Sequence, residues 1–124
     1  MKILIVDDIF TNRLLLVELI KSIGHDYVQT ENGREAVEAM LTDDFDLVLM
    51  DIEMPVMNGL ETTKFIRENF SPPKNGVPIV ALTAHNPQLF FEDFKDVGFN
   101  QLLTKPYNID KLTSLISELS IGQA

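Results

Sequence analysis

Residues 47–51 read Leu47-Val48-Leu49-Met50-Asp51, an uninterrupted apolar run that ends in an aspartate. Such a run is typical of a strand that is covered on both faces of a parallel sheet. Two other segments have the same character, at residues 3–6 and 79–82, and residues 27–30 and 101–104 are weaker candidates. The sequence therefore predicts five short strands.

Longer segments with the helical spacing of apolar residues lie between and after these strands. The first covers residues 12–23 and stops before Gly24, whose conformational freedom suits the residue that follows a helix. The others lie around residues 36–40, 60–70, 87–97 and 109–119. Five strands that alternate with five helices predict a doubly wound α/β domain, in which right-handed crossovers place helices on both faces of a parallel sheet.

The length of 124 residues fits one compact domain, which we expect to cover residues 1–124. The 19 acidic and 10 basic side chains give a net charge of −9, which disfavours binding to nucleic acid or to anionic membranes. No apolar run approaches the roughly 20 residues of a membrane span, and the N-terminus lacks the features of a signal peptide. The absence of cysteine excludes disulfides and thiol chemistry. We therefore expect a cytoplasmic protein.

Five side chains that can carry chemistry follow the predicted strands: Asp7, Asp8, Asp51, Thr83 and Lys105. Ligands of doubly wound sheets bind outside the carboxyl ends of the strands, so we expect these side chains to share one edge of the sheet. Each residue alone has an ordinary interpretation, because aspartates often cap helices or start turns and lysines are usually solvated.

Taken together, the three aspartates predict a cation site. Two carboxylates about 4 Å apart repel by roughly 4 kcal/mol at an effective dielectric constant of ~20, so three on one edge require a neutralising partner. Oxygen ligands with free coordination positions suit Mg²⁺. A carboxylate can also accept a phosphoryl group, a reaction that needs chiefly positioning and charge neutralisation. The sequence thus predicts phosphoryl transfer to Asp51 beside a divalent cation, with Lys105 and Thr83 in support.

The sequence closely resembles the receiver domain of two-component response regulators, over essentially the whole chain. The marks are Leu4-Ile5-Val6-Asp7-Asp8, Asp51-Ile52-Glu53-Met54-Pro55-Val56-Met57-Asn58-Gly59, Ala81-Leu82-Thr83-Ala84 and Lys105-Pro106, in this order. The resemblance implies a CheY-like, flavodoxin-like (βα)5 fold whose parallel strands have the order 2-1-3-4-5.

The resemblance also implies a metal site and a phosphoacceptor. Asp51 would take the phosphoryl group from a phosphohistidine. Asp8, Asp51 and the backbone carbonyl of Glu53 would bind Mg²⁺ directly, with Mn²⁺ as a possible substitute, and Asp7 would act through a bound water. The Glu53 side chain would affect the lifetime of the phosphoaspartate.

Further matched positions concern the phosphoryl group and the output signal. Lys105 would pair with the phosphoryl group, the Lys105-Pro106 peptide would be cis, and Thr83 would move toward a phosphoryl oxygen. The family usually has an aromatic residue or histidine at the position of Leu102, which turns inward on activation. A leucine cannot supply that ring rotation, so we expect the output to use another route. Gly59 suits a helix-entry loop where a side chain would crowd the site.

The predicted function is a phosphoacceptor signalling switch in a phosphorelay, a domain that assists only its own phosphotransfer and dephosphorylation and is otherwise not an enzyme. Its partners would be a histidine kinase or histidine phosphotransfer protein and a downstream effector. Candidate docking surfaces are the apolar run at residues 14–17 and the adjacent Phe90 and Phe91, although these phenylalanines are equally suited to a core.

Three alternatives remain at this point. A phosphatase of the aspartyl-phosphate type would need an Asp-x-Asp pair, but Glu53 stands two residues after Asp51. A flavin-binding module would need a loop rich in glycine and hydroxyl groups after the first strand, where residues 8–12 are Asp-Ile-Phe-Thr-Asn. A degenerate receiver that takes no phosphoryl group is disfavoured by the intact set of acidic residues.

Overall fold

A computed structural model of the protein describes residues 1–54, 56–84, 96–105 and 107–123. Its strands are β1 (Lys2–Val6), β2 (Asp26–Thr30), β3 (Leu47–Asp51), β4 (Ile79–Thr83) and β5 (Gln101–Thr104). The described helices are α1 (Phe10–Ser22), α2 (Gly33–Thr42), α3 (Gly59–Asn69) and α5 (Ile109–Gln123), with a 3-10 turn, η1, at Lys74–Gly76.

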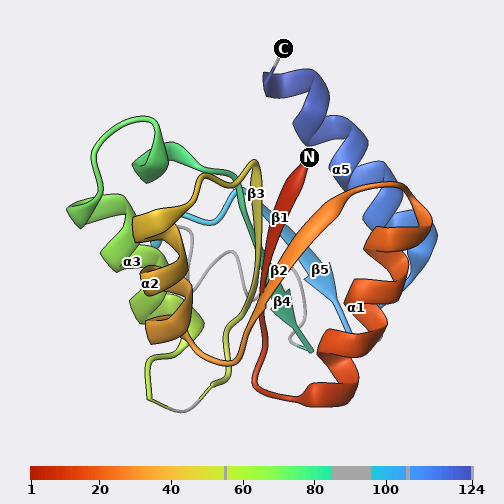
Figure 1. The fold of residues 1–124 in the computed structure, drawn as a ribbon, viewed down its shortest axis with the longest axis horizontal. Helices are drawn as coiled ribbons and strands as arrows, with labels where there is room; N and C mark the ends of the chain where they lie inside the picture. Colours follow the sequence, from red (N-terminus) through yellow and green to blue (C-terminus); the bar gives the residue numbers. More distant parts are fainter. Residues whose placement is uncertain (55, 85–95, 106, 124) are drawn as a thin grey trace.

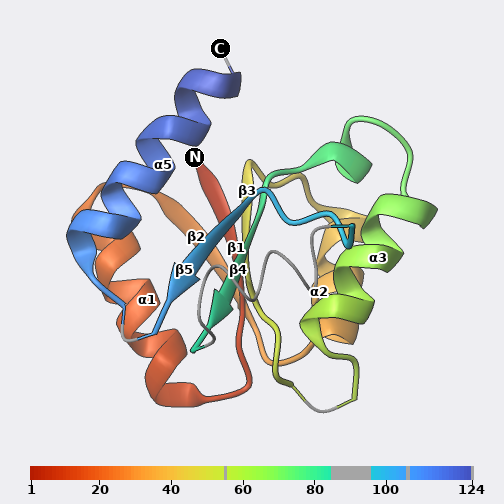
Figure 2. The ribbon, with the colours of Figure 1, turned by 180° about the vertical axis from the view of Figure 1, so that it is seen from behind.

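The five strands form one parallel sheet in the order β2-β1-β3-β4-β5. In Figure 1, α1 and α5 cover one face of this sheet and α2 and α3 cover the other, and Figure 2 shows the same two layers from behind. The predicted doubly wound architecture, the strand order and the position of each strand are therefore confirmed. The predicted helix over residues 87–97 falls largely outside the described residues, as do Phe90 and Phe91.

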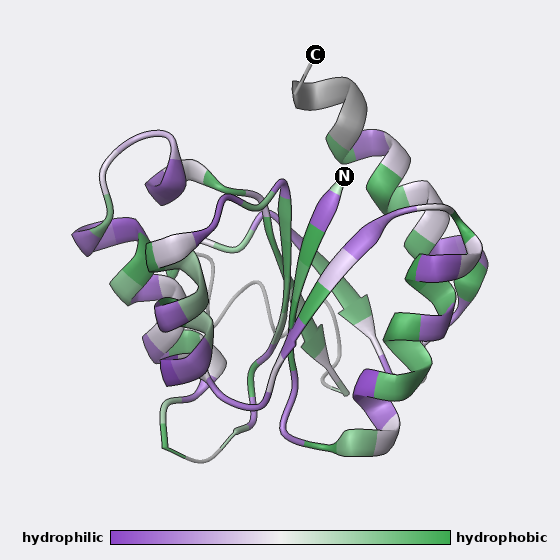
Figure 3. Ribbon diagram, in the orientation of Figure 1, coloured by the Kyte–Doolittle hydropathy of each residue, from purple (hydrophilic) through white to green (hydrophobic). Residues whose placement is uncertain are grey.

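Alternate side chains of each central strand point to opposite faces of the sheet. In β1, Ile3 and Ile5 pack against α1 and α5, whereas Leu4 and Val6 pack against α2 and α3. Strand β3 divides in the same way, and all its residues are buried. Figure 3 shows that the central strands are largely apolar and that α2 and α3 carry more polar residues than α1 does. This double burial is the physical reason why the strands are continuous apolar runs.

Helix boundaries follow from local capping. The side chain of Asn58 accepts the backbone N–H of Glu61, and the Glu61 carboxylate accepts the backbone N–H of Asn58, which forms a capping box that starts α3. Asn32 caps α2 in a similar way. Gly24 follows α1 with a φ of +82°, as predicted for this position. Helix α1 begins at Phe10, two residues before the predicted start, because the Arg13 N–H already bonds to the Ile9 carbonyl.

The carboxyl ends of the strands lie together at one edge of the sheet. Val6 pairs with Met50 across β1 and β3, Asp51 pairs with Leu82, and the last residues of β4 and β5 pair with each other. The start of β1 and the end of α5 lie at the opposite edge (Figure 1). The last residues of β1, β3, β4 and β5 thus lie at the end of the sheet that is remote from the start of β1.

Candidate functional site

Three carboxylates converge at the carboxyl edge of the sheet. Asp7 directly follows β1, Asp51 is the last residue of β3, and each of Asp7, Asp8 and Asp51 offers a ligand atom that lies within 4.8 Å of the other two. Asp7 is 0% exposed and Asp51 is 1% exposed, whereas Asp8 faces solvent. The predicted convergence of these residues is therefore present in the structure.

The two carboxylate oxygens of Asp51 have different environments. Oδ1 accepts the backbone N–H of Glu53 at 3.1 Å and lies 3.4 Å from Nζ of Lys105. Oδ2 is buried and has no hydrogen-bond partner among the described residues. A buried acceptor without a partner is costly, so this oxygen is available to a group other than the described residues.

The pKa of the Asp51 carboxyl reflects the same arrangement. Burial raises this pKa from 3.8 to about 6, and the negative charge of Asp7 contributes in the same direction. The Glu53 N–H and the Lys105 ammonium oppose this increase by stabilising the carboxylate. The metal-free site is therefore short of positive charge.

These residues fit a hard divalent cation. The donor set consists of carboxylate oxygens, which Mg²⁺ and Mn²⁺ prefer. Oδ2 of Asp51, which has no hydrogen-bond partner among the described residues, is available to a cation. Asp8 and Glu53 are exposed beside the buried pair, so the cluster is open to solvent on one side. A cation there would offset the charge repulsion from Asp7, which adds to the effect of burial on the pKa of Asp51.

Asp7 accepts hydrogen bonds from three groups. Its Oδ1 accepts the backbone N–H of Ile9 at 2.9 Å, and its Oδ2 accepts the hydroxyl of Tyr107 at 3.4 Å. The backbone carbonyl of Asp7 accepts Nη1 of Arg13 at 2.7 Å. Burial, followed by the charges of Asp7 and Asp51, raises the pKa of Tyr107 above its ordinary value.

Sequence reasoning missed Tyr107 and Arg13 as neighbours of the acidic site. Arg13 gives no signal, since it stands in a helix whose contacts are set by the fold. Tyr107 gives a weak one, because it follows Lys105 by two residues beyond the end of β5.

Thr83 and Lys105 occupy the neighbouring strand ends. Thr83 ends β4 and is buried, and its backbone carbonyl accepts the N–H of Lys105 at 2.8 Å. The Lys105 side chain points to Asp51, with its Nζ 3.4 Å from Oδ1. Pro106 lies outside the described residues, and so does the peptide geometry that was predicted for it.

Gly59 lies directly behind Asp51. A Cβ atom on this glycine would stand 2.3 Å from the backbone carbonyl oxygen of Asp51 and 2.7 Å from Cα of Ile52. No side chain fits there without displacing the end of β3. The predicted crowding at Gly59 is thus present, and it acts on the backbone that carries Asp51.

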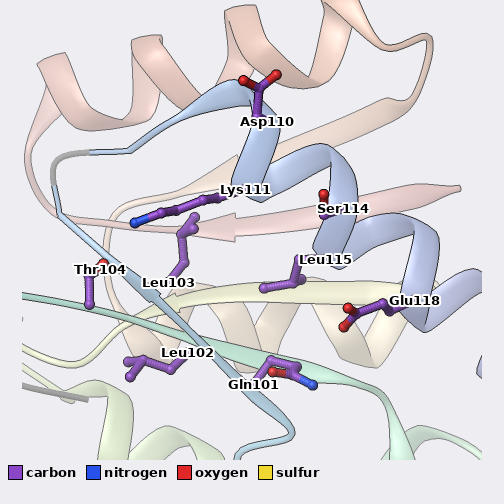
Figure 4. A pocket seen from close by; sticks show the side chains of 9 residues that line it. All are labelled: Gln101, Leu102, Leu103, Thr104, Asp110, Lys111, Ser114, Leu115 and Glu118. Carbon is purple, nitrogen blue, oxygen red and sulfur yellow. The ribbon is translucent and has the colours of Figure 1, made fainter.

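Leu102 lies in the middle of β5, away from the acidic site. It is partly buried and packs beside Ile52 and Ala81. Leu102 also lines a groove of 510 Å³ between β5 and α5, together with Leu115 and Glu118 (Figure 4). None of the acidic-site residues lines this groove.

A family model for the response regulator receiver domain matches residues 3–117. The chain belongs to this family. Two-component response regulator 24 of Arabidopsis thaliana is 34% identical over 118 residues, which cover 94% of this chain and 82% of that protein. The chain spans 17% and 13% of the length of two bacterial sensor kinases that it also matches.

Two solved structures add detail about relatives. The receiver domain of sensor histidine kinase PA1611 from Pseudomonas aeruginosa, with a magnesium ion in its active site cleft, has a TM-score of 0.85 and 30% identity and covers 95% of both chains. The receiver domain of the Saccharomyces cerevisiae response regulator Ssk1, solved with the phosphotransfer protein Ypd1, has a TM-score of 0.88 and 34% identity, covering 100% of this chain and 91% of that one.

Within the part of the chain that the structure describes, every helix is too short or too polar to cross a lipid bilayer.

Proposed function

We propose that this chain is a receiver domain over residues 1–124 that works as a phosphoacceptor signalling switch. Asp51 accepts a phosphoryl group from a phosphohistidine on a histidine kinase or a histidine phosphotransfer protein. The observation that carries this proposal is the cluster at the strand ends, in which Lys105 lies 3.4 Å from Oδ1 of Asp51 and the three aspartates approach within 4.8 Å.

The acidic residues divide the work of holding the cation. Asp8, Asp51 and the backbone carbonyl of Glu53 would ligate Mg²⁺, or Mn²⁺ in its place, and Asp7 would act through a bound water. When bound, the cation supplies positive charge to the phosphoryl oxygens and to the carboxylates. The unpartnered Oδ2 of Asp51 supports this assignment.

The chain's own residues position the transfer. A carboxylate oxygen of Asp51 forms a bond to phosphorus while the bond from phosphorus to the donor's imidazole nitrogen breaks, and the imidazole leaves with the electron pair. Lys105 neutralises charge on the transferred group, because its ammonium already lies beside Asp51. The Thr83 hydroxyl then moves toward a phosphoryl oxygen, and this movement changes the surface that the domain presents to its partner.

Leu102 could transmit the signal of phosphorylation through packing, although a leucine has no aromatic ring that could rotate inward. It packs beside Ile52, which follows Asp51 directly, and this packing links β5 to the phosphorylated strand end. A shift of the loop after β3 would therefore reach the surface at β5 through apolar contacts. The domain changes partner binding in this way, and its only chemistry is its own phosphorylation and dephosphorylation.

Phosphorylation by a small-molecule donor tests the proposal. The protein is incubated with acetyl phosphate and Mg²⁺, and the intact mass is measured for the wild type, Asp51→Asn and Asp44→Asn. Asp44 is an exposed acid remote from the cluster, so that variant is the matched control. We expect one phosphoryl group on the wild type and on Asp44→Asn, and none on Asp51→Asn or in the presence of EDTA.

Other results would support other functions. A wild type that gains no phosphoryl group from any donor would be a degenerate receiver. Sustained hydrolysis of varied phosphoesters would indicate a phosphatase.

The phosphotransfer partner has a candidate docking surface on α1. Ile9, just before the helix, and Phe10, Leu14 and Leu15 are exposed and form what we call the α1 patch. Leu16 and Val17, which belong to the predicted surface at residues 14–17, are buried instead. Phe10 and Leu14 stand four residues apart and share one side of the helix. The patch begins immediately after the acidic pair Asp7 and Asp8, so a helix docked on it would bring a phosphohistidine close to Asp51.

This surface can be tested apart from the chemistry. Leu14→Ser should slow phosphotransfer from a phosphorylated histidine phosphotransfer protein at least fivefold and leave phosphorylation by acetyl phosphate unchanged. Leu41→Ser, at another exposed leucine on α2, is the control and should alter neither rate. Equal rates for Leu14→Ser and the wild type with the protein donor would rule out the α1 patch.

A further inference from the structure

Tyr107 places a phenol hydroxyl inside the acidic site. Its OH lies 3.4 Å from Oδ2 of Asp7, and its ring packs against the apolar core beneath α1 and α5. Tyr107 stands just before α5, whereas Asp7 follows β1, so the contact joins two distant parts of the chain.

The Tyr107 hydroxyl completes the support of the Asp7 carboxylate. Oδ1 accepts the Ile9 N–H at 2.9 Å, so one donor meets each carboxylate oxygen of a residue that is fully buried. The two donors lie on different segments, one beside each oxygen of the carboxylate. Asp51 differs, because both of its described donors meet Oδ1.

We propose that Tyr107 is a positioning residue that holds the Asp7 carboxylate in the orientation required by the divalent cation. This inference rests on the proposed function, because it concerns the same cation. Tyr107 does not touch the cation; it acts through Asp7, as groups behind the ligands of many metal sites do.

A phenol is chemically suited to this task. It donates one hydrogen bond and carries no positive charge, so it orients Asp7 without cancelling the negative charge that attracts the cation. A lysine at the same place would compete with the cation for the carboxylates. The ring is rigid and anchored in the core, so its hydroxyl is directed with little loss of side-chain freedom on metal binding.

The test compares the two tyrosines of the chain. Tyr107→Phe removes only the hydroxyl that meets Asp7. Tyr27→Phe is the matched control, because Tyr27 packs against the same apolar core and its hydroxyl has no hydrogen-bond partner among the described residues. We expect Tyr107→Phe to weaken Mg²⁺ binding roughly fivefold, less than the loss on removing a group behind a direct ligand because Asp7 acts on the cation through a water, and Tyr27→Phe to bind as the wild type does.

The measurement is calorimetric titration of the full chain with MgCl₂, without a phosphoryl donor. An Mg²⁺ affinity of Tyr107→Phe within twofold of the wild type, or tighter, would overturn the proposal. The same holds if Tyr27→Phe loses as much affinity as Tyr107→Phe, since the effect would then come from the core.

A second readout does not require the Tyr107→Phe variant to fold. In Tyr27→Phe, Tyr107 is the sole tyrosine and the chain has no tryptophan, so ultraviolet absorbance near the tyrosine band reports on Tyr107 alone. Mg²⁺ should shift this band, and an unchanged spectrum at saturating Mg²⁺ would contradict the inference.

These results are independent of phosphorylation. A protein that binds Mg²⁺ through a Tyr107-dependent site but takes no phosphoryl group would refute the phosphorylation of Asp51, and it would leave the cation site, and with it this inference, standing. If the protein is phosphorylated but its Mg²⁺ affinity does not depend on Tyr107, the proposed function stands and this inference is refuted.

Discussion

The Lys105 ammonium lies 3.4 Å from Oδ1 of Asp51 and leaves Oδ2 of the same carboxylate unpartnered among the described residues. The lysine therefore does not balance the charge of this site. Asp51 sits at a strand end beside Asp7, with its pKa raised to about 6 chiefly by burial. The folded protein tolerates this arrangement at a cost in stability, and that cost can be measured.

Replacing Asp51 with asparagine should stabilise the metal-free protein in a pH-dependent way. The pKa of Asp51 is higher in the fold than its ordinary 3.8, so the folded state binds the proton more tightly than the unfolded state. The protonation of Asp51 therefore stabilises the folded wild type fully below about pH 4, and this stabilisation is lost as the pH rises through about 6. At about pH 7, Asp51→Asn should exceed the wild type by about 3 kcal/mol in the free energy of unfolding.

Urea unfolding in EDTA at a series of pH values measures this difference. Asp44→Asn, at an exposed carboxylate, should follow the wild type throughout. Adding Mg²⁺ at neutral pH should raise the stability of the wild type and leave Asp51→Asn unchanged. If the difference in unfolding free energy between the wild type and Asp51→Asn does not vary with pH, the pKa of Asp51 is not raised by the fold.

Gly59→Ala should damage both the fold and the phosphoacceptor. The new methyl group would stand 2.3 Å from the carbonyl oxygen of Asp51, which cannot move without shifting β3. We expect a loss of more than about 2 kcal/mol in the free energy of unfolding, together with slower phosphorylation by acetyl phosphate. Thermal unfolding and intact mass measure the two effects.

The control for this change is Gly76→Ala. Its Cβ would meet nothing within 4 Å, so we expect a change within about 0.5 kcal/mol. Similar unfolding free energies for Gly59→Ala and Gly76→Ala would show that the backbone at the end of β3 shifts at little energetic cost.

Two adjacent threonines of α3 should respond in opposite directions to valine. Both are fully buried, but Oγ1 of Thr62 bonds to the Asn58 carbonyl at 2.7 Å, whereas Oγ1 of Thr63 is unpartnered among the described residues. Thr63→Val should raise the free energy of unfolding by up to about 1 kcal/mol, and Thr62→Val should lower it by about 1 kcal/mol. Chemical denaturation of the pair decides this, and a loss of stability in Thr63→Val would mean that its hydroxyl has a partner in solution.

Val56 should be replaceable by glycine with a gain in stability. Its φ of +70° is a left-handed conformation that a β-branched residue rarely adopts, and its side chain is 76% exposed, so little packing would be lost. Relief of this strain should add about 1 kcal/mol to the free energy of unfolding, measured by urea denaturation.

Leu41→Gly is the control for Val56→Gly, because Leu41 is similarly exposed but lies in α2. It should lose about 1 kcal/mol. A loss in both variants would indicate that the loop conformation of Val56 is not strained.

Sequence patterns predicted the sheet because both of its faces are buried, which leaves an unmistakable apolar run in β1, β3 and β4. The residues after these strands were predictable for a similar reason, since the carboxyl ends of parallel strands meet at one edge. The start of α1 at Phe10 was harder to predict from the sequence, because it is set by a backbone hydrogen bond to Ile9 and not by a capping side chain. The Tyr107 contact to Asp7 depends on side-chain geometry across 100 residues of chain, which no local pattern encodes.

The placement of the chain ends has a practical consequence. Met1 leads into β1 at the edge of the sheet that is remote from Asp51, and α5 runs to the same edge (Figure 1). An affinity tag, a fluorophore or a surface anchor fused at either end would therefore leave the acidic edge and the α1 patch facing free solution. Protein immobilised through either end can thus be used to measure the binding kinetics of the metal and of the phosphoryl donor, because the attachment point lies away from both binding surfaces.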